Sequence, residues 1–368
     1  MPKRERIVTY NGLRGIASLA ILFSHMSYLD KADNVFWHGF WKLFMSKGAV
    51  CTTFFFLCSG FFLNYTWKND AFKAYIIKKI KRIYPLTFIV LLMAIAVDIL
   101  LSGNNIVSGS VSTGSSQWFL NILMNAMLLK AFIPMESVFY SFHGPSWYIS
   151  ALFWLYVFAY PLLRGLNSNN KEVWWKWIIR ICASAYAIEL IVCIVVQSTG
   201  LDSLWPCYVN PFFRIFGEGL AGVILCERME YLRKKITNTN LVECTAVIVF
   251  FLDFLLRNIL RVKIYSAWLQ AIPMGLLLIA FRNGTGIISK VLKTKILQFM
   301  GDVSFELYMT HAFVYEGLPI VAGVLNTDMK SWLIIHAGTR FLITLFLSYF
   351  VAYIFSVIMR ILINKIVN

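Results

Sequence analysis

An arginine and a histidine share one apolar stretch near the start of the chain, NGLRGIASLAILFSHMSYL. Arg14 and His25 are eleven residues apart, which at 100° per residue is three helical turns plus about 20°, so a helix would project both from one face. Their separation along the helix axis would be about 16 Å, roughly half of a ~30 Å hydrocarbon core. If this helix crosses a membrane, the spacing predicts a polar path along one of its faces. Arg14 would bind an anion near one membrane surface, and His25 would accept a proton beyond the middle.

Each residue of this pair also has a plain structural interpretation. Arg14 could anchor the helix by reaching the nearest lipid headgroups. His25 could instead form a hydrogen bond to a neighbouring helix. The two residues together favour a path, because both would lie on the same helix face.

A second polar stripe lies near the end of the chain, in GDVSFELYMTH. Ser304, Tyr308 and His311 follow one another at i, i+4 and i+7, so they share one face of a helix. A second histidine inside an apolar segment supports a polar cavity within the protein.

A cationic cluster follows the second apolar segment, in NDAFKAYIIKKIKRIYPL. Its apolar residues form one stripe of a helix, with most of the cations off that stripe. One interpretation is an amphipathic helix that lies on anionic lipid. The other is a floor that binds the phosphates of a polyanionic cofactor. The cations are Lys78, Lys79, Lys81 and Arg82.

Other polar residues interrupt apolar segments at positions that suggest support for a site. Ser59 stands in FFFLCSGFFLNYTW beside a glycine, a pattern typical of close helix packing. Trp147 and Ser150 share a face at a helix start, where an aromatic belt is the plain interpretation. Arg214 and Glu218 stand at i, i+4 and would either hold helices together or line a cavity.

The composition requires that these residues be positioned by membrane helices. Of the 368 residues, 59% are hydrophobic and 14% are charged, against about 45–50% and about 25% in soluble chains. This excludes a soluble enzyme, a disordered chain and a disulfide scaffold, and indicates a polytopic all-α membrane protein.

The distribution of charge and of cysteines argues against two further classes of partner, nucleic acids and metal ions. The net charge is +16, but the cations lie in short segments between apolar runs. That distribution is typical of the positive-inside bias and of contact with anionic membrane lipid rather than of nucleic-acid binding. The seven cysteines form no CxxC pair and no metal-ligand spacing, so we expect no metal site.

The distribution of basic loops decides how many segments cross the membrane. If segment 118–133 crossed, the basic clusters near 164–171, 228–235 and 282–295 would all face the outside. If it does not cross, all three face the inside together with both termini. We therefore predict ten transmembrane helices plus one re-entrant or interfacial segment, 118–133, with the uncharged stretch 102–116 outside. The apolar segments are 13–29, 48–66, 84–101, 118–133, 147–163, 174–197, 212–226, 241–256, 264–281, 303–319 and 331–360.

Five motifs in chain order resemble acyltransferase family three, the ten-span membrane acyl- and acetyltransferases that decorate bacterial glycans. The motifs are Arg14 with His25, FFxxSGF at 55–61, RIYP at 82–85, WxxS at 147–150 and GxxSFxxYxxH at 301–311. One departure concerns a glutamate that many members carry five residues after the tryptophan, where this chain has Leu152. Many members also carry a C-terminal extracytoplasmic domain. Here we expect residues 1–368 to form a single transmembrane acyltransferase domain without that extra domain.

The resemblance implies a reaction and two substrates. The donor would be cytosolic acetyl-CoA, or a related acyl-CoA, and no metal would take part. The acceptor would be a sugar hydroxyl of an exported surface glycan or lipid-linked saccharide. The protein would reside in the bacterial cytoplasmic membrane with both termini in the cytosol.

The resemblance also implies roles for the residues noted above. Arg14, with some of the cations at 78–82, would hold the phosphates of the donor. His25 would act as general base on the acceptor hydroxyl, or less readily carry the acyl group itself, and His311 is the rival base. Tyr308, Ser59 or Ser304 could stabilise the developing oxyanion.

Two alternatives remain open at this point. The chain could be a transporter or flippase for a glycolipid or polar solute, with Arg14 and His25 as a proton relay. Transport folds commonly carry inverted repeats, and the sequence has no visible internal repeat. The chain could also be a different multi-span acyltransferase, with a catalytic histidine paired to an asparagine.

Overall fold

The computed structural model describes residues 6–30, 35–42, 48–100, 111–133, 135–199, 210–259, 267–325, 328, 332 and 336–367. Within these ranges every regular element is helical, which confirms the all-α prediction. Most of the predicted outside stretch, 102–110, lies outside the described residues.

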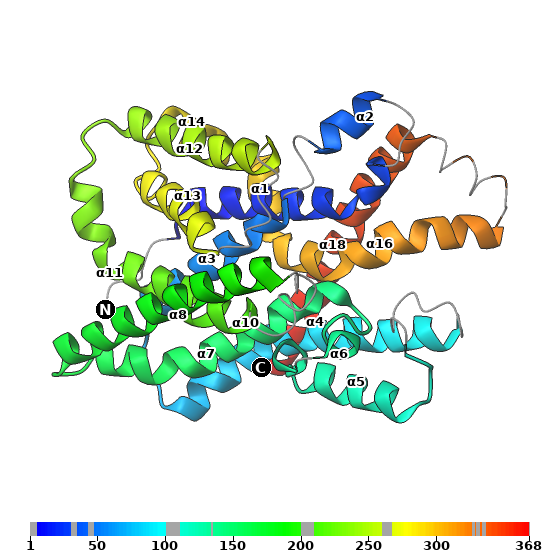
Figure 1. The fold of residues 1–368 in the computed structure, drawn as a ribbon, viewed down its shortest axis with the longest axis horizontal. Helices are drawn as coiled ribbons and strands as arrows, with labels where there is room; N and C mark the ends of the chain where they lie inside the picture. The colour runs from blue at the N-terminus through cyan, green and yellow to red at the C-terminus, as the bar shows by residue number, and fades with distance from the viewer. Residues whose placement is uncertain are drawn as a thin grey trace.

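The first half of the chain forms long helices joined by short helical turns (Figure 1). The helices are α1 (Val8–His25), α2 (Val35–Phe40), α3 (Cys51–Tyr65), α4 (Phe72–Leu100), α5 (Ser116–Ala126), α6 (Glu136–Phe139), α7 (Trp147–Leu166) and α8 (Lys171–Thr199). The 3-10 turns are η1 (Ser27–Leu29), η3 (Gly48–Val50), η4 (Lys130–Phe132) and η5 (Gly144–Ser146).

The second half begins with a short helix that passes into a π-helical turn. The elements are α10 (Asn210–Phe213), the π turn η7 (Arg214–Gly219), α11 (Leu220–Lys234), α12 (Thr239–Ile259), α13 (Ala267–Ala280), α14 (Ile287–Leu292), α15 (Lys295–Asp302), α16 (Ser304–Leu325) and α18 (Ala337–Val367).

Four helical stretches of the described residues are long and apolar enough to cross a membrane. They are Phe72–Leu100, Gly144–Leu166, Thr239–Leu256 and Ala337–Asn364, and Cys51–Tyr65 and Leu269–Ala280 are shorter apolar helices. These helices support a membrane protein, and the count of ten crossings stays a prediction.

Segment 118–133 is broken into two short pieces. Helix α5 has 11 residues, which rise about 16 Å, roughly half of a hydrocarbon core. The chain then turns at Leu128, which has a φ of 56°, and continues into η4. The polar side chains of α5 face the protein, because the Nδ2 atoms of Asn121 and Asn125 donate to Ser137 O and Ser141 Oγ. This geometry agrees with a segment that does not cross.

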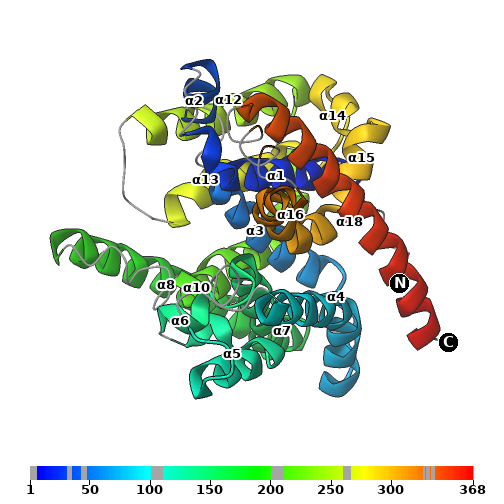
Figure 2. The ribbon, with the colours of Figure 1, turned by 90° about the vertical axis from the view of Figure 1, so that its right-hand side faces the viewer.

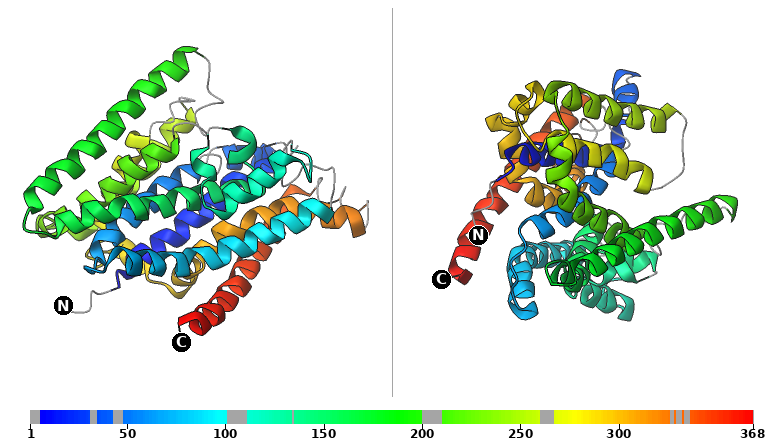
Figure 3. Two further views of the ribbon diagram at one scale, coloured as in Figure 1. Left: turned by 90° about the horizontal axis from the view of Figure 1, so that it is seen from below. Right: turned by 90° about the vertical axis from the view of Figure 1, so that its left-hand side faces the viewer.

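Helix α3 and helix α16 lie at the centre of the bundle. In Figure 2, which looks along α16, α1 and α12–α15 lie on one side of the pair and α4–α8 lie on the other. Seen from below, the start of α1 and the end of α18 point toward the same end of the molecule (Figure 3).

Glycines allow α1 to approach α15 closely. A Cβ on Gly15 would lie 2.8 Å from Met300 Cβ and 2.9 Å from Gly301 N. On the opposite helix, a Cβ on Gly301 would lie 2.0 Å from Asn11 O. The Asn11 side chain also donates to Asp302 Oδ1 over 2.9 Å. The glycines of the NGLRG segment therefore set the distance between α1 and the corner where α16 begins.

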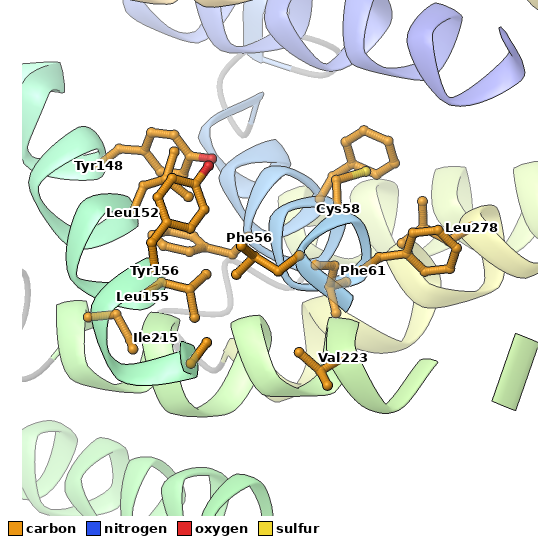
Figure 4. Packing of buried hydrophobic residues seen from close by; sticks show 14 of the residues in the cluster. Phe56, Cys58, Phe61, Tyr148, Leu152, Leu155, Tyr156, Ile215, Val223 and Leu278 are labelled. Atoms are coloured by element: carbon orange, nitrogen blue, oxygen red, sulfur yellow. The ribbon is translucent and has the colours of Figure 1, made fainter. Parts of the chain in front are cut away.

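Helix α3 packs through its phenylalanines between α7 and the π turn. Phe56 lies beside the side chains of α7 and near Ile215 of η7, whereas Phe61 points away from α7 toward Leu278 of α13 (Figure 4). A Cβ on Gly60 would lie 1.8 Å from Gly219 O, so the two backbones touch. The neighbour of Ser59 is thus a close-packing residue, as its sequence context suggests.

The pair Arg214 and Glu218 joins three helices. The two side chains form a buried ion pair on η7. Arg214 Nη1 also donates to Thr53 Oγ1 over 2.6 Å, and Thr53 Oγ1 donates to Gln270 Oε1 over 2.8 Å. The pair therefore connects η7 to α3 and α13, and it lines neither of the two large cavities described below.

We predict that Gly60→Ala lowers the stability of the folded protein by about 1–3 kcal/mol, because the new methyl group collides with backbone. Thermal unfolding in detergent measures the effect. Gly275→Ala in α13 is the matched control, since a Cβ there meets no atom within 4 Å. Equal melting temperatures for the two variants would contradict the close approach of α3 and η7.

Candidate active site

A cavity of about 600 Å³ opens among α1, α3, α4, α7 and α16. Its walls carry four basic and two acidic side chains: Arg6, Arg14, Lys79 and Arg82 against Asp302 and Glu306. Because Arg6 already pairs with Asp302 over 2.6 Å, the basic groups that remain exceed the acidic ones. We call this space the basic cavity.

Arg14 is fixed at the wall of the basic cavity by the start of α16. Its Nη2 atom donates to Ser304 Oγ over 3.0 Å, and Ser304 Oγ donates to Gly301 O over 2.8 Å. Arg82 lines the same cavity from α4. Two guanidinium groups that share one cavity repel each other, and a bound polyanion would relieve that repulsion.

Only part of the cationic cluster on α4 reaches the basic cavity. Lys79 and Arg82 line it, whereas Lys78 and Lys81 do not. Lys78 is exposed and pairs with Asp70 over 2.7 Å. Lys79 Nζ lies over the ring of Tyr156, 4.7 Å from its centre. Lys81 lies on another face of the helix, because neighbouring residues point 100° apart, whereas Lys78 lies one turn before Arg82 and is held by Asp70.

His25 and His311 come together although they are far apart in the chain. Their ring centres are 4.9 Å apart and the rings meet edge to face at 61°. His25 Nδ1 lies 2.8 Å from Ile21 O, and His311 Nδ1 lies 2.8 Å from Tyr308 O. A carbonyl oxygen can only accept, so each Nδ1 carries the proton and each Nε2 keeps its lone pair. Both rings are therefore set to take a proton at Nε2.

The two histidines do not line the basic cavity. His25 lines a second cavity, of about 300 Å³, which we call the His25 cavity. His311 is 1% exposed and lies between the two spaces. Its ring centre is 5.8 Å from that of Tyr308, which lines the basic cavity. Arg14 and His25 thus belong to different cavities, because Tyr308 and His311 of α16 fill the space between them.

Ser59 lines the basic cavity beside two tyrosines of α7. The hydroxyl groups of Tyr148 and Tyr156 point toward each other in Figure 4, and both residues line the cavity together with Ser59. This wall can donate hydrogen bonds to a carbonyl oxygen in the cavity.

A third histidine, His143, lies beside this pair in the turn that precedes α7, and its sequence pattern predicted no role for it. It is 3% exposed, its ring centre is 6.5 Å from that of His311, and it stacks on Phe313 at 5.4 Å. Neither ring nitrogen has a hydrogen-bond partner among the described residues. Burial, with smaller contributions from His311 and Lys130, lowers the pKa of His143 well below its usual range, so the ring is neutral.

Lys130 of segment 118–133 holds the turn that carries His143. Its Nζ donates to Ser141 O over 2.9 Å, and to His143 O and Ser146 Oγ over 3.0 Å each. The next carbonyl along this turn, Pro145 O, accepts a hydrogen bond from the Tyr308 hydroxyl over 2.7 Å. In sequence, Lys130 stood out only as a charge in a short apolar segment, because its partners are distant in the chain.

Trp147 and Ser150 anchor this same region rather than line either large cavity. Ser150 Oγ donates to Leu128 O and accepts from Ala131 N. Trp147 stacks on Phe139 with 5.7 Å between ring centres. Both residues therefore attach segment 118–133 and its following turn to α7.

The position of the missing family glutamate lies in the wall of the basic cavity. Leu152 lines that cavity, and so does the carboxylate of Glu306 on α16. A carboxylate is thus present in the cavity from a different helix. Among the described residues, no group of three or more His, Cys, Asp or Glu side chains could hold a metal ion.

Comparison with known proteins adds a family and one relative. A family model described as "Acyltransferase domain" matches residues 7–363. "Acyltransferase MdmB" of Streptomyces mycarofaciens is 23% identical over 361 residues, a match that covers 92% of this chain and 86% of the relative. No solved structure matches the chain.

We predict a pH dependence of stability that originates at Lys130. Burial lowers the pKa of Lys130 to about 7, whereas an unfolded lysine titrates near 10.4. Between these values the unfolded chain binds more protons, so stability rises with pH from about 7 to about 10, by at most about 1.4 kcal/mol per pH unit. Denaturant unfolding of Lys130→Met over this range should show a shallower slope than the unsubstituted protein.

Lys290→Met, at an exposed lysine of α14, is the control and should keep the slope. An unchanged slope in Lys130→Met would show that the dependence arises elsewhere.

Proposed function

The chain belongs to the acyltransferase family whose model matches residues 7–363, and from that premise we propose that it moves an acetyl group from cytosolic acetyl-CoA to a sugar hydroxyl of an exported or lipid-linked surface glycan. Membership in this family makes the chain an acyltransferase and favours acyl transfer over the transport alternative. The observation that carries the finer proposal is that Tyr308 and His311 separate two cavities, one lined by Arg14 and the other by His25.

The basic cavity suits the donor. Coenzyme A carries several phosphate groups, and guanidinium groups bind phosphate with two parallel hydrogen bonds. Arg14, Arg82 and Lys79 line this cavity and would hold those phosphates. The arm of the donor would then extend toward Tyr308, at the end of the cavity nearest the histidines.

The His25 cavity suits the acceptor. His25 Nε2 would take the proton from a sugar hydroxyl, whose oxygen attacks the thioester carbonyl. The new carbon–oxygen bond forms, the carbon–sulfur bond breaks, and the proton passes from His25 to the thiolate of the leaving coenzyme A. His311 would orient His25 through their ring contact.

The oxyanion that forms needs hydrogen-bond donors on the donor side. The hydroxyl groups of Tyr308, Ser59 and Ser304 line the basic cavity. Tyr308 is nearest to the histidines, so we assign the principal role to Tyr308. It would have to exchange its hydrogen bond to Pro145 O for one to the reacting carbonyl.

The distribution of positive charge indicates the side of the membrane to which each cavity would open. In a bacterial cytoplasmic membrane with ten crossings and both termini cytosolic, the basic cavity would open to the cytosol and the His25 cavity to the other side. Support comes from Arg6, near the start of the chain, and from Lys79 and Arg82 of α4, which all line the basic cavity.

A transfer assay in proteoliposomes tests this function. Labelled acetyl-CoA is sealed inside or added outside, and decyl β-glucoside on the opposite face is the acceptor probe. We expect acetylated glucoside and free coenzyme A in vesicles where the basic cavity faces the donor. The proposal would be contradicted if coenzyme A is released but the glucoside carries no label, both with the donor inside and with the donor outside the vesicles.

We predict that Arg14→Lys raises the KM for acetyl-CoA by about 10-fold or more, because an ammonium group keeps the charge but loses the two-pronged contact. Steady-state kinetics measures the change. Lys78→Ala, which removes a cation outside the basic cavity, should leave this KM unchanged. If Arg14→Ala binds the donor normally, the phosphate role is wrong.

We predict that His25→Ala lowers kcat by about 10²–10⁴, with donor binding retained, because His25 lines the other cavity. His25→Gln should not restore activity, since an amide forms hydrogen bonds but transfers no proton. A purely structural His25 would instead give an active glutamine variant and a poorly expressed alanine variant.

The same kinetics for His311→Ala ranks the two histidines. A positioning role predicts a smaller loss than in His25→Ala. An inactive His311→Ala beside an active His25→Ala would reverse the assignment.

A further inference from the structure

The His25 cavity contains an arginine that has no acidic partner among the described residues. Arg340 of α18 lines this cavity together with His25. Arg6, Arg214, Arg233 and Arg282 each lie within 4.0 Å of a carboxylate oxygen. Within the described part of the chain, Arg340 has no such contact, and its buried Nε atom has no hydrogen-bond partner. A guanidinium group without a carboxylate partner at a cavity wall favours the binding of an anionic ligand.

The guanidinium of Arg340 is held in a fixed direction. Its central carbon lies 3.9 Å from the centre of the Tyr28 ring, in cation–π contact. This contact occupies one face of the planar group, and within the described residues its two Nη atoms form no ion pair with a carboxylate. A guanidinium edge matches a carboxylate or a phosphate with two parallel hydrogen bonds.

The one carboxylate among the described lining residues of this cavity is engaged elsewhere. Glu316 Oε1 accepts a hydrogen bond from the Tyr315 hydroxyl over 2.7 Å. The Glu316 side chain is exposed and can accept further hydrogen bonds from hydroxyl groups. A molecule in this cavity would therefore meet the cation of Arg340 and, separately, the hydrogen-bond acceptor of Glu316.

The remaining lining suits a ring with apolar faces and polar edges. Tyr28 and Tyr315 contribute aromatic surface, and Pro319 and Ile320 contribute aliphatic surface. A saccharide has that character, since its C–H groups pack on aromatic rings while its hydroxyl groups form hydrogen bonds.

We propose that the acceptor is an anionic saccharide whose carboxylate or phosphate binds Arg340 while one of its hydroxyl groups meets His25 Nε2. This inference rests on the proposed acyl transfer and specifies its acceptor. The anionic group is either a carboxylate on the sugar ring or a phosphate on the sugar, and both match the guanidinium edge of Arg340.

Three acceptor probes that differ in charge test the inference in proteoliposomes with acetyl-CoA. They are octyl β-glucoside, octyl β-glucuronide and octyl β-glucoside 6-phosphate. We expect at least one anionic probe to have a KM about 10-fold or more below that of the neutral glucoside. The anionic probe with the lower KM identifies the group. Equal KM values for all three probes would overturn the inference.

Variants at Arg340 locate the preference. Arg340→Gln should remove the advantage of the anionic probe and leave the KM of octyl β-glucoside unchanged. Arg180→Gln is the matched control, because Arg180 makes a similar contact with Trp177 on α8 and lies outside both cavities. A uniform loss on all probes in Arg340→Gln would contradict the proposal. If that variant does not fold, Arg340→Lys takes its place and should raise only the KM of the anionic probes.

Binding without chemistry separates this inference from the proposed reaction. Thermal unfolding in detergent is measured with the anionic probes in the absence of acetyl-CoA. A stabilisation by octyl β-glucuronide that Arg340→Gln abolishes would support the anionic site even if no probe is acetylated. Acetylation of all three probes with equal efficiency would support acyl transfer and reject the anionic acceptor.

Discussion

The contact between α1 and the corner where α15 ends and α16 begins determines the arrangement of the whole candidate site. Gly15 and Gly301 bring the two backbones together, which places Arg14 on Ser304 at one end and His25 against His311 further along. In both helices the residue with the higher number lies toward the same end, so α1 and α16 run in the same direction, as Figure 1 also shows. One contact thus sets both the donor-side arginine and the pair of histidines.

The parallel direction of α1 and α16 also bears on the number of crossings. Two helices that cross in the same direction need an odd number of crossings between them. The sequence offers eight apolar segments between 13–29 and 303–319, so if α1 and α16 both cross, an odd number of these segments does not. Segment 118–133 is the one whose basic flanks argue against crossing, and its helix α5 has only 11 residues. Helix direction is therefore consistent with the prediction of ten crossings, and the choice of segment 118–133 rests on charge distribution and helix length.

Local spacing predicted which residues share a helix face. It could not predict which side chains from other helices lie between those residues. The periodicity of α1 correctly aligned Arg14 with His25, but the side chains of Tyr308 and His311 come from a helix almost 300 residues away in the chain and divide the space. Along α4, four cations in a run cannot all face one cavity, and which of them do depends on how the helix is rotated against its neighbours. Lys130 and His143 gained their roles from hydrogen bonds and ring contacts to other elements, which no local pattern records.

The layer formed by Tyr308 and His311 solves a problem that any transfer across a membrane must meet. A donor and an acceptor have to react at one point without a continuous aqueous pore, since water at that point would hydrolyse the thioester. The Tyr308 hydroxyl donates to Pro145 O, and the turn that carries this carbonyl is held by the three hydrogen bonds of Lys130. In the proposed reaction the Tyr308 hydroxyl would exchange this hydrogen bond, worth about 1 kcal/mol, for one to the developing oxyanion. Segment 118–133 would then support the barrier, which gives a physical reason for the burial of its polar side chains Asn121, Asn125 and Lys130.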